Sequence, residues 1–410
     1  MLLAASIVLI LGLSIKGFMR WRSMSGLSDS LSTGESLPGS RQVYLEFPTT
    51  SANRASSSTG IEGVTDETVD NTTSVALDFS GLDTAKLKPF EVIADVHQAL
   101  ACAEDATNRR LYLSYRDGAI QVVSTETGQV IARAMLDAPA YHLLVDEKGQ
   151  KLVAASIAPG SLRQGIVGEK EYARVHFQIY DLKKLSGADS SPALQPVKTL
   201  KYDFFVGRMI FSEDRRKVYF VAEEAGKVRV GEILVDDWTM KIPFTVKGTG
   251  PIYLSRGPDE KTLLFLAGGR LLSIDPSTWK FRQSLSIGGT VHAVETGASG
   301  KVYLLERRVG VRILVLDMAS RRFVSRWIVE SEGKPAYCVS SDRKHLFLSV
   351  YGVSAGRILG IDISEDQSPW GKPWGIAESN RQRFPRGELS ISENKSLLFS
   401  GSGQIFRTGL

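Results

Sequence analysis

The feature that most constrains this chain is a strand pattern that recurs seven times between residues 100 and 410. Each copy has an apolar stretch, a polar turn and a second apolar stretch that is reached six positions after the turn opens. The residues that open the turn are Asp105, Asp146, Ser212, Gly257, Thr296, Ser340 and Ser392. They are 41, 66, 45, 39, 44 and 52 positions apart. Two intervals are therefore longer than the roughly 40–45 residues of a four-stranded repeat and contain insertions.

The segments on either side of each turn have the composition of β-strands. Residues 110–115 and 217–221 are rich in aromatic and aliphatic side chains, which suit a pleated, packed surface. Gly-containing segments such as 116–118 and 267–269 follow, and Gly accepts the positive φ of a tight hairpin. Sheets of this size that repeat radially form a β-propeller. The predicted fold class is therefore all-β, a seven-bladed β-propeller over residues 89–410.

The last copy of the pattern is incomplete. It supplies three strands, at residues 387–391, 396–400 and 404–408. Residues 90–94 precede the first copy and have no repeat of their own. Pairing of this N-terminal segment with the C-terminal strands would complete the last sheet and remove two open sheet edges. We therefore expect the two ends of the repeat region to meet in one shared blade.

The first residues of the chain have the character of a membrane segment. Residues 2–15 are apolar except for two serines, and basic residues follow from Lys16 onward. If Lys16 snorkels, residues 2–19 are long enough to span a bilayer. Residues 1–22 are thus predicted to be a transmembrane or signal-anchor helix. A cleaved signal peptide is the alternative, although a basic start and an Ala-x-Ala cleavage site are missing.

Two further properties of the N-terminal region leave alternatives open. Residues 23–88 are rich in Ser and Thr and carry nine acidic and four basic side chains, which predicts a flexible, disordered linker that is either solvated or laid against the basic ring. The basic residues after the apolar run favour a cytoplasmic propeller. A misassigned start codon would instead make the propeller extracytoplasmic.

One set of polar residues has the same register in several copies. The fourth residue before each turn-opening residue is Ala101, His142, Arg208, Tyr253, His292, Ala336 or Glu388. The next residue is mostly apolar, so strand alternation separates the two sets and places the first beside the mouth of a central channel. A ring of His142, Arg208, Tyr253, His292 and Glu388 would bind an anionic or peptidic ligand, with Arg208 pairing a carboxylate or phosphate. The alternative is a set of solvated polar residues at the mouth of a water-filled channel.

A long insertion belongs to the same candidate site. Residues 157–174 lie between the second and third strands of the second copy, on the face where first strands begin. Arg163, Lys170 and Arg174 would then lie over the channel mouth, and loops on a rigid scaffold commonly carry binding residues. An ordinary surface loop is the alternative.

The sequence lacks the common catalytic and metal-binding signatures. It has no Cys-x-x-Cys, no phosphate-binding loop and no Gly-x-Ser-x-Gly. His142 and His292 would face each other across the ring, too far apart to share a metal. The acidic residues of the first strands, Glu104, Glu295 and Glu388, have no Asn partner for a calcium site. We therefore predict no catalytic residue, no metal and no cofactor.

The remaining candidate features point to structural roles. Cys102 and Cys338 fall on first strands of blades that are not neighbours, so they are expected to be buried free thiols. A cluster of arginines between residues 307 and 326 lacks the interleaved aromatic residues of a nucleic-acid site, so nucleic acid is not expected as a partner.

The repeats resemble those of WD40-like and YVTN-like propellers. The resemblance is carried by residues 118–123 and 126–131, and by turns that open with an apolar residue followed by Asp, such as Ile274-Asp275 and Leu316-Asp317. It covers about residues 89–410 and implies an interaction platform, although some relatives of this architecture are enzymes. The leading hypothesis is a membrane-tethered, non-catalytic scaffold for protein or peptide binding. The alternatives are a propeller-type hydrolase or quinoprotein-like oxidoreductase that uses the channel mouth, and a structural envelope module.

Overall fold

The chain divides into two compact units, Met1–Ser51 and Ala52–Leu410. The computed structural model describes residues of the second unit only. These residues are 74–77, 88–89, 91–95, 99–157, 175–185, 193–202, 204–250, 252–288, 291–308, 310–329, 337–340, 342–351, 356–364, 372–379, 389–391, 397–400 and 404–408. The predicted N-terminal helix and most of the predicted linker lie outside the described residues.

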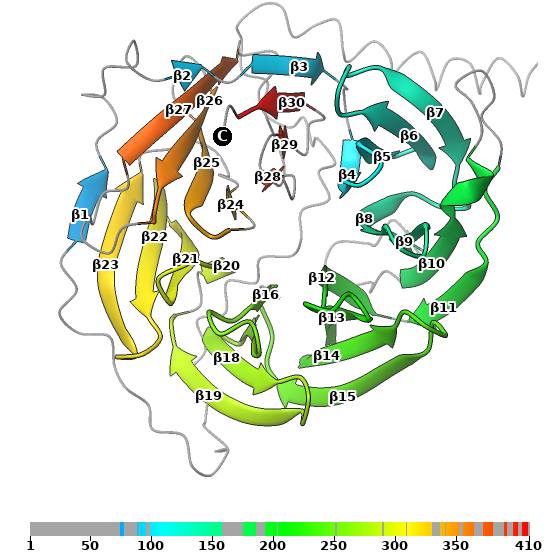
Figure 1. Ribbon diagram of the computed structural model, residues 1–410. Coiled ribbons are helices and arrows are strands. Elements are labelled where there is room, and N and C mark those ends of the chain that lie inside the picture. The colour runs from blue at the N-terminus through cyan, green and yellow to red at the C-terminus, as the bar shows by residue number, and fades with distance from the viewer. Residues whose placement is uncertain are drawn as a thin grey trace, which may run out of the picture. The chain divides into compact units, whose positions relative to one another are not determined.

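Six sheets of four consecutive strands are arranged around a common centre, and each is called a blade here (Figure 1). Blade 1 contains β4 (Ala99–Asp105), β5 (Arg110–Tyr115), β6 (Ala119–Ser124) and β7 (Val130–Met135); blade 2 contains β8 (Ala140–Asp146), β9 (Lys151–Ile157), β10 (Val175–Asp181) and β11 (Lys198–Tyr202); blade 3 contains β12 (Phe205–Phe211), β13 (Lys217–Glu224), β14 (Lys227–Leu234) and β15 (Met240–Lys247). Blade 4 contains β16 (Leu254–Arg256), β17 (Leu263–Ala267), β18 (Arg270–Asp275) and β19 (Lys280–Ser286); blade 5 contains β20 (Val291–Thr296), β21 (Lys301–Arg308), β22 (Gly310–Asp317) and β23 (Arg322–Val329); blade 6 contains β24 (Tyr337–Val339), β25 (His345–Tyr351), β26 (Gly356–Asp362) and β27 (Lys372–Ser379). The first strand of each blade is the innermost (Figure 1).

One further sheet closes the ring, and it combines both ends of the repeat region. It contains β28 (Leu389–Ile391), β29 (Leu397–Ser400), β30 (Gln404–Arg407) and, at its outer edge, β3 (Glu91–Asp95). β3 is antiparallel to β30, with Glu91 opposite Arg407 and Asp95 opposite Gln404. Residues 91–95 thus pair with β30, one position along the chain from the predicted segment 90–94, and the shared sheet expected from the incomplete last copy is present.

The predicted fold class nevertheless needs correction. The structure has six blades of four consecutive strands, not seven, because the last copy supplies only three short strands and its sheet depends on β3. The described part of the chain has one helical element, the 3-10 turn η3 (Leu182–Lys184), and the predicted hydrophobic helix of residues 1–22 lies outside that part. Over the same residues, no helix has the length and apolar character needed to cross a membrane.

The predicted disordered linker is also wrong at two places. β1 (Ser74–Leu77) is parallel to β23, where it pairs with Arg326–Val329. β2 (Lys88–Pro89) is parallel to β27 and pairs with Gly375 and Ile376. Blades 5 and 6 therefore become five-stranded, and the chain preceding β4 contributes to three consecutive sheets.

The outermost strands of five blades share a β-bulge. The extra residue of the bulge is Ile131 in β7, Arg282 in β19, Val324 in β23 and Trp374 in β27, and in β15 the register shifts between Lys241 and Phe244. A bulge disrupts the ladder locally and bends the strand. β1 and β2 both pair with the part of the outer strand that follows the bulge.

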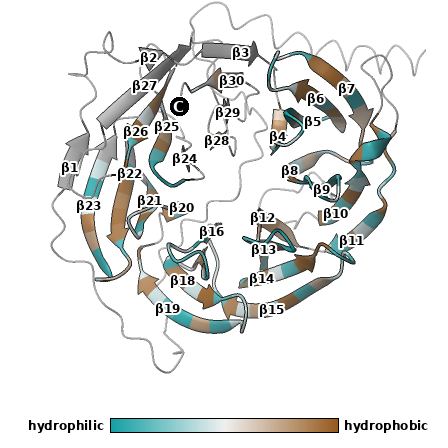
Figure 2. Ribbon diagram, in the orientation of Figure 1, coloured by the Kyte–Doolittle hydropathy of each residue, from teal (hydrophilic) through white to brown (hydrophobic). Residues whose placement is uncertain are grey.

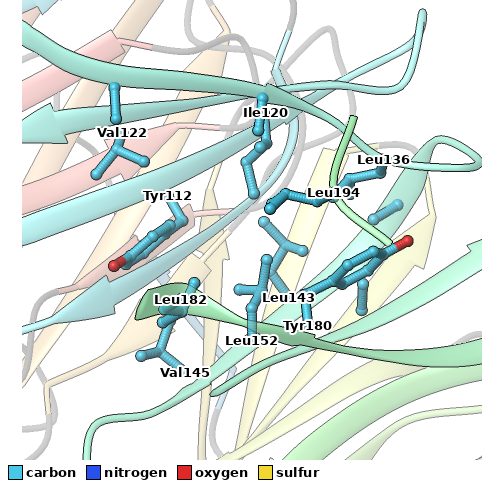
Figure 3. Packing of buried hydrophobic residues seen from close by; sticks show 14 residues of the cluster. Tyr112, Ile120, Val122, Leu136, Leu143, Val145, Leu152, Tyr180, Leu182 and Leu194 are labelled. Carbon is cyan, nitrogen blue, oxygen red and sulfur yellow. The ribbon is translucent and has the colours of Figure 1, made fainter. Parts of the chain in front are cut away.

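The hydrophobic core lies between neighbouring blades. In β5, Tyr112 belongs to a cluster with residues of the neighbouring blade such as Val145 and Leu152 (Figure 3), whereas Leu111 and Leu113 belong to a different cluster. Middle strands are therefore apolar on both faces, while outer strands such as β15 and β19 alternate between hydrophobic and hydrophilic residues (Figure 2). Burial of each such side chain contributes about 1.5–3 kcal/mol, so blade-to-blade packing dominates the stability of the ring.

Five of the turn-opening residues in the described part of the chain are buried polar groups, namely Asp105, Asp146, Ser212, Thr296 and Ser340. The backbone N–H of Asn108 donates to Asp105 Oδ1 at 3.0 Å, and that of Lys217 donates to Ser212 Oγ at 2.9 Å. At Gly257 a Cβ atom would lie 1.9 Å from Thr262 Oγ1, so the threonine hydroxyl occupies the place of the missing side chain. A polar atom closes the turn between the first and second strands at these positions, whereas the Thr296 hydroxyl donates to the backbone oxygen of Arg256 in blade 4.

Candidate functional site

Four of the five residues predicted to lie at the channel mouth are described, and they lie on inner strands or directly beside one. His142, Arg208 and His292 lie on β8, β12 and β20, and Tyr253 lies directly before β16; all four are partly exposed. The residues that follow them, Leu143, Met209, Leu254 and Ala293, are buried. The alternation expected from the sequence therefore holds in blades 2 to 5. Glu388 and the loop residues Arg163, Lys170 and Arg174 lie outside the described residues.

Four of the inner strands change register close to these positions. The shift lies between Ala99 and Ala101 in β4, Ala140 and His142 in β8, Val206 and Arg208 in β12, and Val291 and Ala293 in β20. Such a bulge increases the local twist and re-aims the side chains beside it. The sequence spacing does not reveal these shifts, although they determine which inner side chains meet.

Glu295 of β20 is the centre of a polar cluster that joins three blades. Arg208 Nη1 of blade 3 donates a hydrogen bond to Glu295 Oε1 at 2.6 Å. The Tyr253 hydroxyl of blade 4 donates to the same oxygen at 2.9 Å, and the Ser255 hydroxyl donates to Oε2 at 3.4 Å. These four residues are called the Glu295 cluster below. A carboxylate that receives a charge-assisted bond and two hydroxyl bonds is held in one orientation.

Arg208 is the more accessible partner of the ion pair. Its side chain is 28% exposed, against 11% for Glu295, and its guanidinium carbon lies 4.3 Å from the centre of the Tyr253 ring. A guanidinium that stacks on an aromatic ring gains a cation–π interaction and keeps a planar set of donors. The cluster thus holds a partly exposed cationic group, backed by an aromatic ring, on the inner strands.

The residues beside the cluster are apolar or protonated. The Tyr337 hydroxyl donates to the backbone oxygen of Tyr303 at 3.1 Å. Burial raises the pKa of Tyr337 and of the Cys338 thiol well above their usual values; the negative charge of Glu295 adds to both shifts and Arg208 opposes them. Both groups therefore stay neutral at physiological pH, and Cys338 is a poor nucleophile. Cys102, also predicted to be buried, is only half-buried.

Contacts made by residues at the ends of the inner strands and in the turns that follow them fix the blades relative to one another. Arg256 of blade 4 donates to the backbone oxygen of Phe211 in blade 3 at 2.8 Å. Arg343 of blade 6 donates to the backbone oxygens of Gly257 and Pro258 in blade 4, at 3.2 and 3.1 Å. Arg256 and Arg343 thus connect blades 3, 4 and 6. The positions of Arg208, Tyr253 and Glu295 are in this way held by rigid neighbours, as preorganised recognition requires.

The structure brings together two of the predicted site residues, Arg208 and Tyr253, and adds Glu295. His142 is elsewhere on the inner surface, in contact with Tyr141 at a ring-centroid distance of 4.8 Å. Sequence analysis identifies Glu295 only as an acidic residue of a first strand. The sequence feature that could have identified Glu295 is its position: it is an acidic residue directly before a turn-opening residue, in a strand that is mostly buried.

The described residues contain no group of three or more His, Cys, Asp or Glu side chains that could hold a metal ion. The donors of the Glu295 cluster are a guanidinium and two hydroxyls around one carboxylate. This arrangement suits the recognition of charged and hydrogen-bonding groups.

Comparisons with known proteins identify the fold. No family model matches the sequence, and no curated protein sequence matches it. Among solved structures, the C-terminal WD40 domain of Sif2 has a TM-score of 0.53 at 9% identity, covering 78% of this chain and 99% of that domain. The β-propeller domain of Cps50 (Swd1) from Myceliophteria thermophila has a TM-score of 0.54 at 12% identity, again covering 78% and 99%. The resemblance to WD40 propellers predicted from the repeats is confirmed at the level of fold.

Proposed function

We propose that this chain is a non-catalytic interaction platform that binds a protein or peptide partner at the Glu295 cluster. The observation that carries the proposal is the ion pair of Arg208 and Glu295 on the inner strands of a WD40-type propeller. Propellers offer a rigid scaffold on which the centre of one face is available to a ligand. Function must be argued from a site and not from the fold, and this cluster joins three blades through hydrogen bonds to one carboxylate.

The chemistry of the cluster selects the ligand class. A carboxylate of the partner, either a side chain or a C-terminus, would share or replace Glu295 as the acceptor for Arg208, because a guanidinium binds carboxylates in a planar, bidentate geometry. Tyr253 supplies the surface beneath the guanidinium and a hydroxyl that can donate to the incoming group. His142 lies on β8 of blade 2 and His292 on β20, the strand of Glu295, and both would contact the rest of the peptide.

Affinity purification of the full-length protein, with quantitative mass spectrometry, tests this proposal. We expect at least one protein to be recovered in stoichiometric amount with the wild type and reduced at least tenfold with Arg208→Ala. Arg282→Ala is the matched control, because Arg282 is an exposed arginine on the outer strand β19. Equal recovery of every protein with Arg208→Ala would contradict the proposal.

The proposal includes a membrane tether through residues 2–19. Its support is the apolar run of residues 2–15 followed by a basic flank. After extraction of membranes with alkaline carbonate, the full-length protein is expected to stay in the pellet, whereas a variant without residues 1–22 is expected in the supernatant. Protease protection in sealed vesicles decides the side of the propeller. Release of the full-length protein into the supernatant would exclude the tether.

A further inference from the structure

The outer edges of the propeller accept extended segments in a recurring way. β1 pairs in parallel with β23, and β2 pairs in parallel with β27. A third parallel contact joins Met135 of β7 to Ala193, with the N–H of Leu194 donating to the backbone oxygen of Met135 at 2.8 Å. In all three blades the contact lies after the bulge of the outer strand. The half of the strand beyond the bulge is therefore the edge that receives an added strand.

β15 of blade 3 has the same bulge and an open edge beyond it. Its register shifts between Lys241 and Phe244, as in the blades that receive a strand. Within the part of the chain that is described, no segment pairs with the outer edge of β15, which is the last strand of its sheet. The residues beyond the bulge, Phe244 to Lys247, alternate between half-buried and exposed. An edge of this kind leaves unpaired N–H and C=O groups that template a further strand.

The charge of this edge selects the chemistry of its occupant. Lys247 of β15 lies directly opposite Lys227 of β14, and both side chains are exposed. Like charges in directly opposite positions destabilise a sheet, so an acidic side chain placed beside them would be favourable. The corresponding edge of β19 lacks such a pair, because Ser286 lies opposite Arg270. β15 therefore combines an open edge with a cationic pair.

We infer that residues 244–247 of β15 form a docking edge for an acidic, extended segment of a partner protein, which adds to blade 3 as a parallel fifth strand. The backbone of the partner would continue the ladder, and an acidic side chain would lie directly beside Lys247, with Lys227 one strand further in and opposite Glu224 of β13. Strand addition to a sheet edge is a general mode of peptide recognition in which backbone bonds give affinity and side chains give specificity. The inference rests on the proposed function as an interaction platform, but it places a second contact away from the Glu295 cluster.

The test uses the full-length protein and a fluorescein-labelled heptapeptide, Thr-Val-Glu-Val-Glu-Val-Thr, followed by fluorescence anisotropy. The peptide is expected to bind the wild type, and N-methylation of alternate backbone nitrogens is expected to weaken binding at least tenfold. The double variant Lys227→Glu with Lys247→Glu is expected to weaken binding to a similar extent. Lys280→Glu, on the outer strand of blade 4, is the matched control and should bind like the wild type.

Four outcomes of this experiment would show that the peptide does not bind at the outer edge of β15 by strand addition. No binding to the full-length protein would overturn the inference, as would equal binding of the N-methylated peptide, which would indicate charge attraction alone. Equal loss with Lys280→Glu would also overturn it, because the site would then not lie at β15. Because the carboxylates of the peptide also suit Arg208, the charge-reversal pair is compared in the Arg208→Ala background. A tenfold loss there assigns the binding to β15, and no loss there overturns the inference, so failure of the Glu295 cluster as a site and failure of the β15 edge are distinguishable.

Discussion

Removal of residues 1–95 is expected to lower the unfolding free energy by about 4 kcal/mol and the melting temperature by roughly 6 °C. The reason is the position of β3 at the outer edge of the sheet that closes the ring. Its loss removes four paired positions with β30, including Val92 opposite the buried Phe406, and exposes the edge of a sheet whose other strands have only three or four residues. Thermal unfolding followed by circular dichroism measures the effect.

Shorter truncations provide the controls for this prediction. Removal of residues 1–73 leaves β1, β2 and β3 in place and should not change the melting temperature. Removal of residues 1–90 deletes β1 and β2, whose six residues lie only on the outside of blades 5 and 6, and should have a smaller effect than removal of residues 1–95. If the truncations at residues 90 and 95 unfold at the same temperature, β3 does not close the ring.

Replacement of Glu295 by Ala is expected to lower the unfolding free energy by about 2 kcal/mol. Arg208 and Tyr253 would lose their shared acceptor, and removal of one partner of a charge-assisted hydrogen bond costs about 1.5–3 kcal/mol. The expected cost lies in the lower part of this range, because the Arg208 side chain is 28% exposed and solvent screens the ion pair. Denaturant unfolding of the variant measures the change.

A double-mutant cycle separates the interaction energy of Arg208 and Glu295 from the cost of shortening each side chain to Ala. The combined Glu295→Ala and Arg208→Ala variant should be more stable than the sum of the two single changes predicts, with a coupling of about 1–2 kcal/mol. Tyr253→Phe is the matched control for the cluster, because it removes one hydroxyl bond and keeps the ring beneath Arg208. Additive effects of the two alanine substitutions would show that the pair contributes no coupling energy.

Much of the architecture could be predicted because it is local and repetitive. The turn-opening residues fixed the register of the strands, since Asp105, Ser212 and their equivalents are the buried groups that close the first turn. The missing strand of the last copy pointed directly to residues 90–94. β1 and β2 could not be predicted, because parallel strands of four and two residues in a Ser/Thr-rich segment leave no periodic pattern.

The candidate site could be predicted only in part. Arg208 and Tyr253 were found because they hold the same place in their repeats. Strand alternation predicted that their side chains lie on the opposite face of the strand from the apolar residue that follows each of them. Glu295 was missed as a member of the site because its contact with Arg208 spans 87 positions and two blade boundaries, and because bulges in β12 and β20 shift the inner register. Such a contact depends on the geometry of the assembled ring.

Photo-cross-linking at the centre of the propeller tests the central claim most directly. The full-length protein would carry benzoylphenylalanine in place of Tyr253, with the same group in place of Lys280 as a peripheral reference, and would be irradiated with its purified partner. The account predicts covalent links to partner peptides from position 253. Links to the partner from position 280 but none from position 253 would contradict it.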